Sequence, residues 1–305
     1  MRILVVGLGD IARKGYLPVL AAMPEADIHL VTRNPAVLSE VGDRYRLRHR
    51  YRSLDDVPRG HFDAAFVHAA TDAHPALIET LLMRDIPVLV DKPLADNLED
   101  AARLIDLADG RKRLLMVGFN RRFAPDYVAL RQLPRSLTLM QKHRRAHPDN
   151  IRRVVFDDFI HVVDTLRFLA PAPILRRHVE TVVRDGLLES IVLMLSGADH
   201  QAIGTMHRAS GLDEERVDIF GGDAKRSSVN LAEWIDADGA ESVTRRGDWT
   251  PVSRQRGFEA MCAHFLAAVA DGRATACDDL LETHALCERI VAHASAGPDA
   301  ADGSA

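Results

Sequence analysis

An imidazole flanked by carboxylates is the first feature of this sequence that could do chemistry. Asp157, His161 and Asp164 lie at intervals of four and three residues, so on an α-helix turning about 100° per residue they share one face, within an arc of about 60°. A histidine titrates near neutral pH, and a nearby carboxylate orients and tunes it. Hydride transfer from an alcohol needs a base to accept the hydroxyl proton, and the reverse reaction needs the same group to donate it. The pattern predicts His161 and Asp157 as catalytic residues, although such a pair taken alone is more often structural.

The chain begins with an apolar run that ends at glycines. Residues 3–6 predict a buried parallel strand and lead into Gly7-Leu8-Gly9-Asp10-Ile11-Ala12. Gly7 allows a tight turn, Gly9 leaves room for a pyrophosphate against the backbone, and Ala12 lets the next helix pack on the strand. The N–H groups at the helix start then face the phosphates. The motif predicts dinucleotide binding by these six residues; the alternative is a tight turn in another kind of α/β protein.

The end of the second predicted strand, residues 27–31, indicates which dinucleotide is bound. Thr32, Arg33 and Asn34 follow this strand. An acidic residue here would accept hydrogen bonds from the adenine ribose and favour NAD, whereas a hydroxyl, a guanidinium and an amide suit a 2′-phosphate. We therefore predict NADP(H) as the preferred cofactor and NAD(H) as the alternative. Arg33 could instead stack over the adenine or point into solvent.

A lysine held by a proline is the second candidate for proton transfer. Lys92 lies in Asp91-Lys92-Pro93, directly after a predicted strand over residues 86–90. Pro93 restricts Lys92 to an extended backbone and raises the chance of a cis peptide bond. Beside a cationic cofactor ring the pKa of the amine would fall, so Lys92 could share or relay a proton. Together with the glycine motif, this rigid lysine favours the catalytic interpretation of His161.

Further residues are expected at the same edge of the sheet. Ligands of a doubly wound sheet bind at the carboxyl ends of its strands. Ala70, Thr71 and His74 follow the apolar residues 62–70, so they should line the cofactor crevice, as should Asp91 and Lys92. His74 could equally cap the helix that follows.

Neither a metal centre nor a covalent nucleophile is predicted. Asp157, His161 and Asp164 could bind a divalent ion, but no further cluster of ligands accompanies them in the sequence. No serine or cysteine lies in a strand–turn–helix elbow.

The first 120 or so residues alternate predicted strands and helices, which favours a parallel sheet with right-handed crossovers. Ser53-Leu54-Asp55-Asp56 predicts a helix start after a short third strand, and residues 114–117 predict the sixth strand. The later part predicts an antiparallel meander. Its expected strands are 136–142, 174–184, 187–195, 201–207, 216–220, 227–235 and 242–246, and its expected helices are 154–169, 258–271 and 279–293.

The predicted fold class is α/β with two domains. Residues 1–122 form a doubly wound Rossmann domain, residues 123–295 form a substrate-binding and oligomerisation domain of α/β type, and residues 296–305 form a disordered tail rich in small and polar residues.

Bulk composition excludes several classes of function. The 305 residues carry a net charge of −5, so no basic field points to nucleic acid; His143-Arg144-Arg145 is expected to be a solvated strand end. No apolar run is long enough to span a membrane, and the core strand starts too early for a cleaved leader. Cys262, Cys277 and Cys287 lack metal-type spacing, and we expect buried thiols in a reducing cytoplasm.

Four motifs in order resemble the Gfo/Idh/MocA oxidoreductases, which include glucose–fructose oxidoreductase and inositol dehydrogenase. They are Gly7-Leu8-Gly9-Asp10-Ile11-Ala12, Asp91-Lys92-Pro93 (with Asp for the family's Glu), Asn120-Arg121-Arg122-Phe123, and the helix from Asp157 through His161 to Asp164. The opening and the segment around His161 are similar to the MviM-like or YceM-type branch of the family.

The resemblance implies a Rossmann domain followed by an α/β domain with a mostly antiparallel open sheet, whose outer face often forms a homodimer. It implies that Lys92, Asp157 and His161 surround the reacting carbon, and that Asn120 and Arg121 lie near the junction of cofactor and substrate. One departure is the segment Asn150-Ile151-Arg152-Arg153-Val154, which replaces the usual glycine-rich approach to the helix. Its arginines could reshape substrate entry or bind an anionic group.

The sequence thus predicts an NADP(H)-dependent oxidoreductase acting on a small secondary alcohol or ketone, sugar-like or polyol, or on an imine. A nucleotide-binding sensor or regulator with little turnover is the alternative. A methyltransferase is a third class, but it would normally want an acidic residue near Thr32, and none is there.

Overall fold

The computed structural model describes residues 1–273 and 277–296, with the side chains of all of these except residues 277 and 278. The chain divides into two compact units. The first is Met1–Asn120 with Val252–Leu281, and the second is Arg121–Pro251 with the chain from Glu282 onward. Val252–Leu281 thus belongs to the first unit although it follows most of the second unit in the sequence. A single division at residue 122 does not describe this. The limits of the domains at residues 122 and 295 stay predictions.

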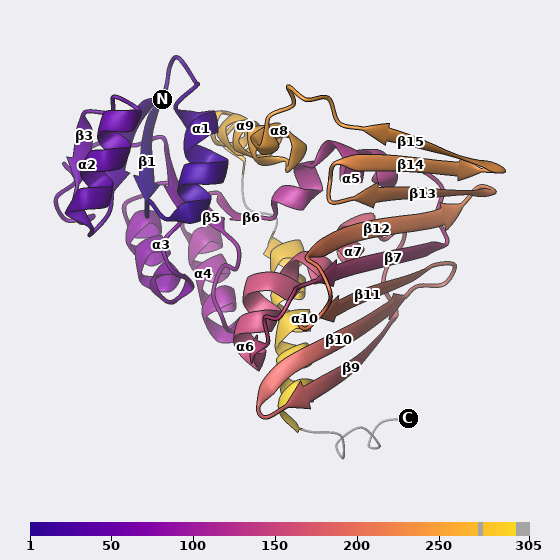
Figure 1. Ribbon diagram of the computed structural model, residues 1–305. Helices are drawn as coiled ribbons and strands as arrows, with labels where there is room; N and C mark the ends of the chain where they lie inside the picture. Colours follow the sequence, from indigo (N-terminus) through magenta and orange to yellow (C-terminus); the bar gives the residue numbers. More distant parts are fainter. Residues whose placement is uncertain (274–276, 297–305) are drawn as a thin grey trace. The chain divides into compact units, whose positions relative to one another are not determined.

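The first unit is built on a parallel sheet of six strands (Figure 1) in the order β3-β2-β1-β4-β5-β6. Since the order reverses between β1 and β4, a switch point lies there, and right-handed crossovers place the helices after β1 and β2 on one face and those after β4 and β5 on the other. The strands are β1 (Arg2–Val6), β2 (Asp27–Val31), β3 (His49–Tyr51), β4 (Ala64–Val67), β5 (Val88–Asp91) and β6 (Leu115–Gly118). The predicted doubly wound parallel sheet is confirmed.

The helices of this unit cover an apolar core. Phe258 and Phe265 of α9 make edge contacts with Tyr16 and with Phe66 of β4, so the returning segment packs on the first helix and the sheet. The helical segments are η1 (Ala12–Tyr16), α1 (Leu17–Leu20), α2 (Pro35–Arg44), η2 (Thr71–Ala73), α3 (His74–Met83), α4 (Leu98–Gly110), α8 (Val252–Gln255) and α9 (Phe258–Ala270).

The predicted helix start at Ser53 is wrong, because residues 52–57 form bends and turns. The Asp56 carboxylate accepts hydrogen bonds from the backbone and the hydroxyl of Ser53, as in a helix cap. Pro58 then restricts Val57 to an extended backbone, so the turn cannot propagate.

The second unit contains a nine-stranded mixed sheet in the order β15-β14-β13-β12-β7-β11-β10-β8, with β9 also paired to β10. The mostly antiparallel open sheet is confirmed. The simple meander is not, because β7 lies between β12 and β11 and pairs parallel with β11. The strands are β7 (Leu137–His143), β8 (Asp149–Asn150), β9 (Arg176–Arg184), β10 (Leu187–Ser196), β11 (Gln201–His207), β12 (Glu214–Gly221), β13 (Ala224–Val229), β14 (Glu233–Asp238) and β15 (Ala240–Arg245).

One expected strand, residues 227–235, is two strands joined by a tight turn. Asn230 and Leu231 both adopt left-handed backbone angles, with φ of 54° and 53°. The turn is held because Asn230 exchanges hydrogen bonds with the backbone of Glu215 on β12. Neither glycine nor proline marks this reversal, so the sequence pattern does not reveal it.

The helices of the second unit are α5 (Pro125–Gln132), α6 (Ile151–Val154), η4 (Val155–Phe159), α7 (Ile160–Leu169) and most of α10 (Cys277–Ala296), and the short turn η3 (Asn120–Phe123) leads into it. The predicted helix 154–169 therefore starts earlier and contains a π-helical turn over Val155–Phe159. Helix α7 packs on β7 and β11. The close approach depends on Gly204, where an added Cβ would lie 2.4 Å from Val162.

Cys262 and Cys287 are buried and unoxidised, as expected. The Cys277 side chain and the tail expected to be disordered (residues 297–305) lie outside the described residues. Among residues 1–273 and 277–296, no helix has both the length and the apolar composition that a membrane crossing needs.

We expect Gly204→Ala to lower the free energy of unfolding by about 1–3 kcal/mol, since the methyl group would overlap Val162 and Leu166 in a packed layer. Urea unfolding measures the loss. Gly110→Ala is the matched control, because an added Cβ there meets nothing within 4 Å. Equal stability of the two variants would contradict the close packing of α7 on the sheet.

Candidate active site

A cavity of about 440 Å³ lies at the carboxyl ends of β1, β2 and β4, beside the switch point. The glycine turn after β1 forms one wall, the ends of β2 and β3 form another, and the end of β4 forms the third. Six of the predicted cofactor residues line it: Gly7, Leu8, Gly9, Thr32, Arg33 and Ala70.

The two glycines of the motif have different roles in this wall. Gly7 has φ of +87°, and an added Cβ would lie 2.5 Å from the backbone nitrogen of Ala69, so only glycine fits. Gly9 faces open space, with nothing within 4 Å of an added Cβ. A pyrophosphate can therefore approach the backbone there, close to the helix start that Arg13 N marks by donating to Gly9 O. Ala12 is fully buried beneath this turn.

The far end of the cavity, after β2 and β3, carries only positive charge. Arg33 and Arg52 line it together with Thr32 and Ser53, and within the described part of the chain no carboxylate does so. Arg52 and Ser53 were not identified from the sequence. They follow β3, and Tyr51 of β3 pairs with Val31 of β2, so adjacency of the two strand ends was the available signal.

The remaining predicted residues around the motif have structural contacts of their own. Asn34 caps α2, because its side-chain oxygen accepts from the N–H groups of Ala36 and Val37. Asp10 is exposed and pairs with Lys14, and Ile11 is also exposed. Their contact with a cofactor stays a prediction.

The turn that carries Lys92 is anchored from two sides. The Lys92–Pro93 peptide bond is cis. The Tyr16 hydroxyl donates to Asp91 at 2.9 Å, and the buried His74 lies 2.8 Å from the Pro93 carbonyl and 3.1 Å from that of Ala69. Burial lowers the pKa of His74, while the hydrogen bonds to the Pro93 and Ala69 carbonyls act in the opposite direction.

The contacts of His74 bridge the ends of β4 and β5 and so position the Lys92 turn, whereas Thr71 begins the turn η2. A cofactor contact by either residue stays a prediction.

His68, which was not identified from the sequence, completes the cavity wall. Its ring stacks on Tyr16 with centroids 3.9 Å apart. Burial lowers its pKa to about 3, so the imidazole is neutral at physiological pH. Its position at the end of β4, two residues before Ala70, was the available signal.

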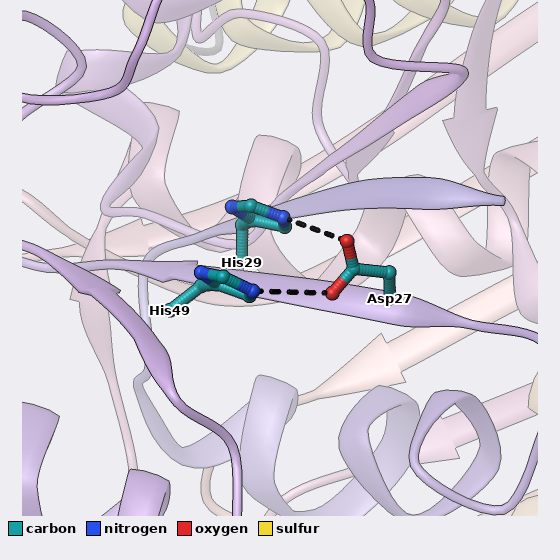
Figure 2. A group of neighbouring side chains, drawn as sticks. All are labelled: Asp27, His29 and His49. Atoms are coloured by element: carbon teal, nitrogen blue, oxygen red, sulfur yellow. Dashed lines mark hydrogen bonds and ion pairs between the residues drawn. The ribbon is translucent and has the colours of Figure 1, made fainter.

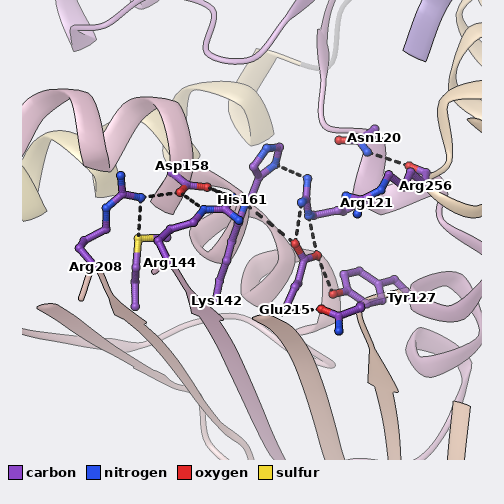
Figure 3. Close-up of polar contacts among 12 residues, drawn as sticks. Asn120, Arg121, Tyr127, Lys142, Arg144, Asp158, His161, Arg208, Glu215 and Arg256 are labelled. Carbon is purple, nitrogen blue, oxygen red and sulfur yellow. Dashed lines mark hydrogen bonds and ion pairs between the residues drawn. The ribbon is translucent and has the colours of Figure 1, made fainter. Parts of the chain in front are cut away.

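Asn120 and Arg121 belong to different units. The Asn120 amide donates to the Arg256 carbonyl at 2.7 Å and so holds the returning segment to β6. Arg121 joins a network of buried charges in the second unit (Figure 3).

Glu215 is the acceptor at one end of this network. Arg121 donates to it through two nitrogens at 2.7 and 2.6 Å, and the Tyr127 hydroxyl donates at 2.9 Å. Burial alone would raise the pKa of Glu215, but the charge and hydrogen bonds of Arg121, together with Lys142 and Tyr127, outweigh it and bring the pKa to about 2. Glu215 is therefore ionised at physiological pH.

Asp158 is the acceptor at the other end, and it holds three cations at once. Lys142 lies 2.8 Å away, Arg144 donates two hydrogen bonds at 2.7 and 2.8 Å, and Arg208 donates one at 2.6 Å. These cations hold the pKa of Asp158 far below its usual range despite its burial. Burial and then the charge of Arg121 lower the pKa of Lys142 to about 7. The expected solvated strand end at Arg144 is therefore wrong, because this guanidinium turns inward to Asp158.

The contact of His161 fixes the position of its proton. Arg121 Nη1 lies 2.9 Å from His161 Nδ1. A guanidinium only donates, so Nδ1 must be the acceptor, and the neutral ring carries its proton on Nε2.

The three residues of the predicted stripe have different basic partners. Asp157 is half exposed and lies 3.7 Å from Arg153, His161 contacts Arg121, and the buried Asp164 forms a two-pronged pair with Arg122. The predicted arc assumed an α-helix throughout, whereas a π turn covers Val155–Phe159 and includes Asp157. That Asp157 shares one face with His161 and Asp164 stays a prediction.

Comparison with known proteins shows the family. Residues 1–119 match the Gfo/Idh/MocA model, described as an oxidoreductase family with an NAD-binding Rossmann fold, and residues 125–236 match the YceM-like C-terminal domain. YceM of Salmonella typhimurium is 35% identical over 285 residues, which cover 88% of this chain and 89% of that protein. The chain belongs to the Gfo/Idh/MocA oxidoreductase family. The resemblance read from the four motifs is thus confirmed.

Other members of the family agree with this assignment. A Gfo/Idh/MocA oxidoreductase from Vibrio cholerae superimposes with a TM-score of 0.89 at 33% identity, and the MviM dehydrogenase of Clostridium difficile with 0.90 at 27%; each match covers 96% of this chain and 99% of the other. The myo-inositol dehydrogenase Hyg17 of Streptomyces leeuwenhoekii is 30% identical over 232 residues, which cover 72% of this chain and 69% of that protein. This Gfo/Idh/MocA protein is an NAD(P)-dependent oxidoreductase.

One group of metal-ligand types gathers at the amino ends of β2 and β3 (Figure 2). His29 and His49 lie 3.2 and 3.5 Å from the two oxygens of Asp27, and their rings stack 4.1 Å apart at 6°. Parallel rings point their nitrogen lone pairs side by side, whereas a metal ion needs donors that converge on one point. His29 Nδ1 also contacts the Tyr51 hydroxyl. The arrangement is a hydrogen-bonded stack, and we assign it a structural role in this family member.

We expect the ionisation of Lys142 to make the free energy of unfolding increase as the pH rises above neutral. Its pKa is about 7 in the folded protein against 10.5 when unperturbed, so between these values the unfolded chain binds more protons and stability rises with pH. Lys142→Met should remove this rise, since Asp158 and Glu215 keep their arginine partners. Urea unfolding at pH 7, 8 and 9 measures the slope, and Lys14→Met on the surface is the control. Parallel curves for wild type and Lys142→Met would contradict the burial of this amine.

Proposed function

We propose that this protein is an NADP(H)-dependent oxidoreductase that moves a hydride between nicotinamide and a small secondary alcohol or ketone, sugar-like or polyol, or an imine. The cavity at the switch point carries the proposal. It combines the glycine turn suited to a pyrophosphate with an end lined by Arg33 and Arg52. Family membership supplies the class of reaction.

The preference for NADP(H) rests on charge. A 2′-phosphate carries about two negative charges and three acceptor oxygens, which guanidinium groups bind well. Arg33 and Arg52 come from two adjacent strand ends, and the Thr32 and Ser53 hydroxyls lie in the same wall. The 2′-hydroxyl of NAD(H) would need an acceptor, and the described lining residues include no carboxylate.

The proposed catalytic residues are Lys92, His161 and Asp157. Bound nicotinamide supplies or accepts the hydride. In the reducing direction, the ammonium of Lys92 gives its proton to the substrate oxygen and regains one from solvent. His161 donates a hydrogen bond to the same oxygen through Nε2–H, because Arg121 occupies Nδ1. Asp157, which is half exposed on the same helix, orients a neighbouring hydroxyl of the substrate. We further propose that Asn120 and Arg121 border the cofactor–substrate junction.

We also propose a homodimer through the outer face of the second unit's sheet. Val192 and Met194 on β10 are 40% and 38% exposed, whereas Ile191 and Leu193, which alternate with them, are buried. Met194 pairs with Ile203 of β11, and Ile203 pairs with Leu139 of β7, so an apolar row crosses three strands on that face. A second copy of the sheet would cover it.

The absence of a basic field and of a spanning helix in the described chain agrees with a small-molecule substrate in the cytoplasm.

We expect Arg33→Ala and Arg52→Ala each to weaken NADPH binding about 10- to 100-fold, the range for a lost hydrogen bond to a charged group. NADH binding should change little, because its ribose has no phosphate there. Titration of NADPH and NADH by nicotinamide fluorescence measures both, with the exposed Arg59→Ala as control. An unchanged NADPH-to-NADH ratio in both variants would remove the arginines from cofactor choice.

We expect Lys92→Ala and His161→Ala to lower turnover by about two to four orders of magnitude, the usual size of an acid–base contribution, while NADPH still binds. His161→Gln should retain more activity than His161→Ala, because an amide N–H can replace the donor at Nε2 but cannot take up a proton. His178→Ala on the surface is the control.

Steady-state assays over a panel of polyols, sugars and ketones provide the readout. Equal loss in the Gln and Ala variants would show that His161 is itself the base. Tight NADPH binding with no turnover on any substrate would favour a sensor.

A further inference from the structure

A second cavity, of about 420 Å³, lies wholly in the second unit and is not accounted for by hydride transfer. Its polar walls come from the end of β7, from β8, α6 and η4, and from the residue after β11. We call it the arginine pocket and define it by Arg144, Arg153, Arg208, Asp149, Asp157 and Asp158. Figure 3 shows two of its arginines, Arg144 and Arg208, on the Asp158 carboxylate.

Charge is unevenly distributed along this pocket. At one end Asp158 faces Arg144, Arg208 and the buried Lys142, which also lies 3.9 Å from Glu215. Glu215 is already paired with Arg121, so positive charge is in excess at this end. At the other end Arg153 lies 3.7 Å from both Asp149 and Asp157, so negative charge is in excess. By contrast, the buried Asp164 forms its ion pair with Arg122. The lowered pKa of Lys142 agrees with the crowding of cations at the first end.

Donor groups remain at the cationic end. A guanidinium carries five N–H donors. Arg144 uses Nε and Nη2 on Asp158, while Arg208 uses Nη1 on Asp158 and Nε on the His147 carbonyl. The shared carboxylate holds both guanidinium groups in place, so little side-chain entropy is lost when they bind an oxyanion.

We propose that the arginine pocket binds an oxyanion of the substrate, a carboxylate or a phosphate, on Arg144 and Arg208. Asp157 accepts a hydrogen bond from a hydroxyl of the same molecule. This rests on the proposed function, since Asp157 belongs to the proposed catalytic set. The substrate class is then an acidic polyol, either a sugar acid or a sugar phosphate, rather than a neutral sugar. The pocket volume suits a molecule of that size.

The structure separates this proposal from the arginines singled out in the sequence. Arg152 forms a two-pronged pair with Glu288 of α10 at 2.9 and 2.6 Å, so it serves packing of the helices. Arg153 lines the pocket at its acidic end. The residues assigned to the anion are therefore Arg144 and Arg208, which sequence reasoning did not place in the site.

Calorimetric titration of the full chain tests the proposal, with saturating NADP⁺ present to occupy any phosphate site in the first unit. The probes are D-gluconate, D-glucose 6-phosphate, inorganic phosphate and neutral D-glucose. We expect gluconate or glucose 6-phosphate to bind at least about tenfold more tightly than glucose, the size of one charged hydrogen bond. The carboxylate and phosphate arms identify the group, and binding of inorganic phosphate alone would show an adventitious ion site and overturn the proposal.

Variants locate the binding in this pocket. Arg144→Gln should lose about tenfold or more in affinity for the anionic probe, whereas Arg153→Gln, which removes the same charge at the acidic end, should stay within about threefold. Arg144→Lys keeps the charge beside Asp158 and covers the case in which Arg144→Gln does not fold; it should lose the two-pronged donation and bind several-fold more weakly.

Equal affinity for glucose and its anionic analogues, or equal loss in the Gln variants at residues 144 and 153, would overturn the proposal. Because the readout is binding, it stands apart from turnover. Anion binding without hydride transfer would leave the pocket assigned and reject the proposed reaction.

Discussion

In the second unit, three cationic side chains are held in place by one carboxylate, that of Asp158. Asp158 accepts from Arg144 and Arg208 and lies against Lys142, cations that follow or belong to the adjacent strands β7 and β11. Removing one partner of a buried ion pair usually costs about 3–5 kcal/mol, and here a single removal would strand three cations. The contacts then continue from Lys142 to Glu215, from Glu215 to Arg121, and from Arg121 to His161. The tautomer of the proposed catalytic imidazole is therefore set by a chain of ion pairs that begins at Asp158.

The first unit reaches its ligand surface by a different route. Two residues without side chains form one wall of its cavity. Gly7 has no room for a Cβ, and Gly9 faces empty space. The histidine in the cavity wall, His68, is neutral, and the charged side chains, Arg33 and Arg52, lie at the far end after β2 and β3. A cofactor shared by many proteins can be held by backbone geometry, since its pyrophosphate needs only N–H groups and a helix start. A substrate specific to one branch of a family needs side chains, and these are what the second unit supplies.

This contrast explains how much the sequence could reveal. The glycine motif, the Lys92 turn and all six strands of the parallel sheet were predicted within a few residues, because each depends on a short local pattern. The cluster of Lys142, Asp158, Arg208 and Glu215 was not predicted, since its members are up to 73 residues apart and meet through the pairing of β7 with both β11 and β12. Asp158 adjoins Asp157 in the sequence, and the sequence pattern did not show that Asp158 is the one that pairs with Lys142, Arg144 and Arg208. The turn at Asn230 was missed because this Asn, which tolerates the left-handed conformation, has no glycine or proline beside it and is followed by a left-handed Leu231.

Both ligand cavities place arginines where the protein as a whole is acidic. With a net charge of −5, the chain repels polyanions at long range, yet Arg33 and Arg52 line one cavity and Arg144 and Arg208 the other. At physiological ionic strength the screening length is about 8 Å, so a small anion that reaches either cavity feels the local arginines and little of the net charge. A long anion such as a nucleic acid extends beyond the cavities, and no net positive charge attracts the rest of it. We therefore expect local arginines and a negative net charge to favour small anions, and this argument applies equally to the proposed cofactor and the proposed substrate.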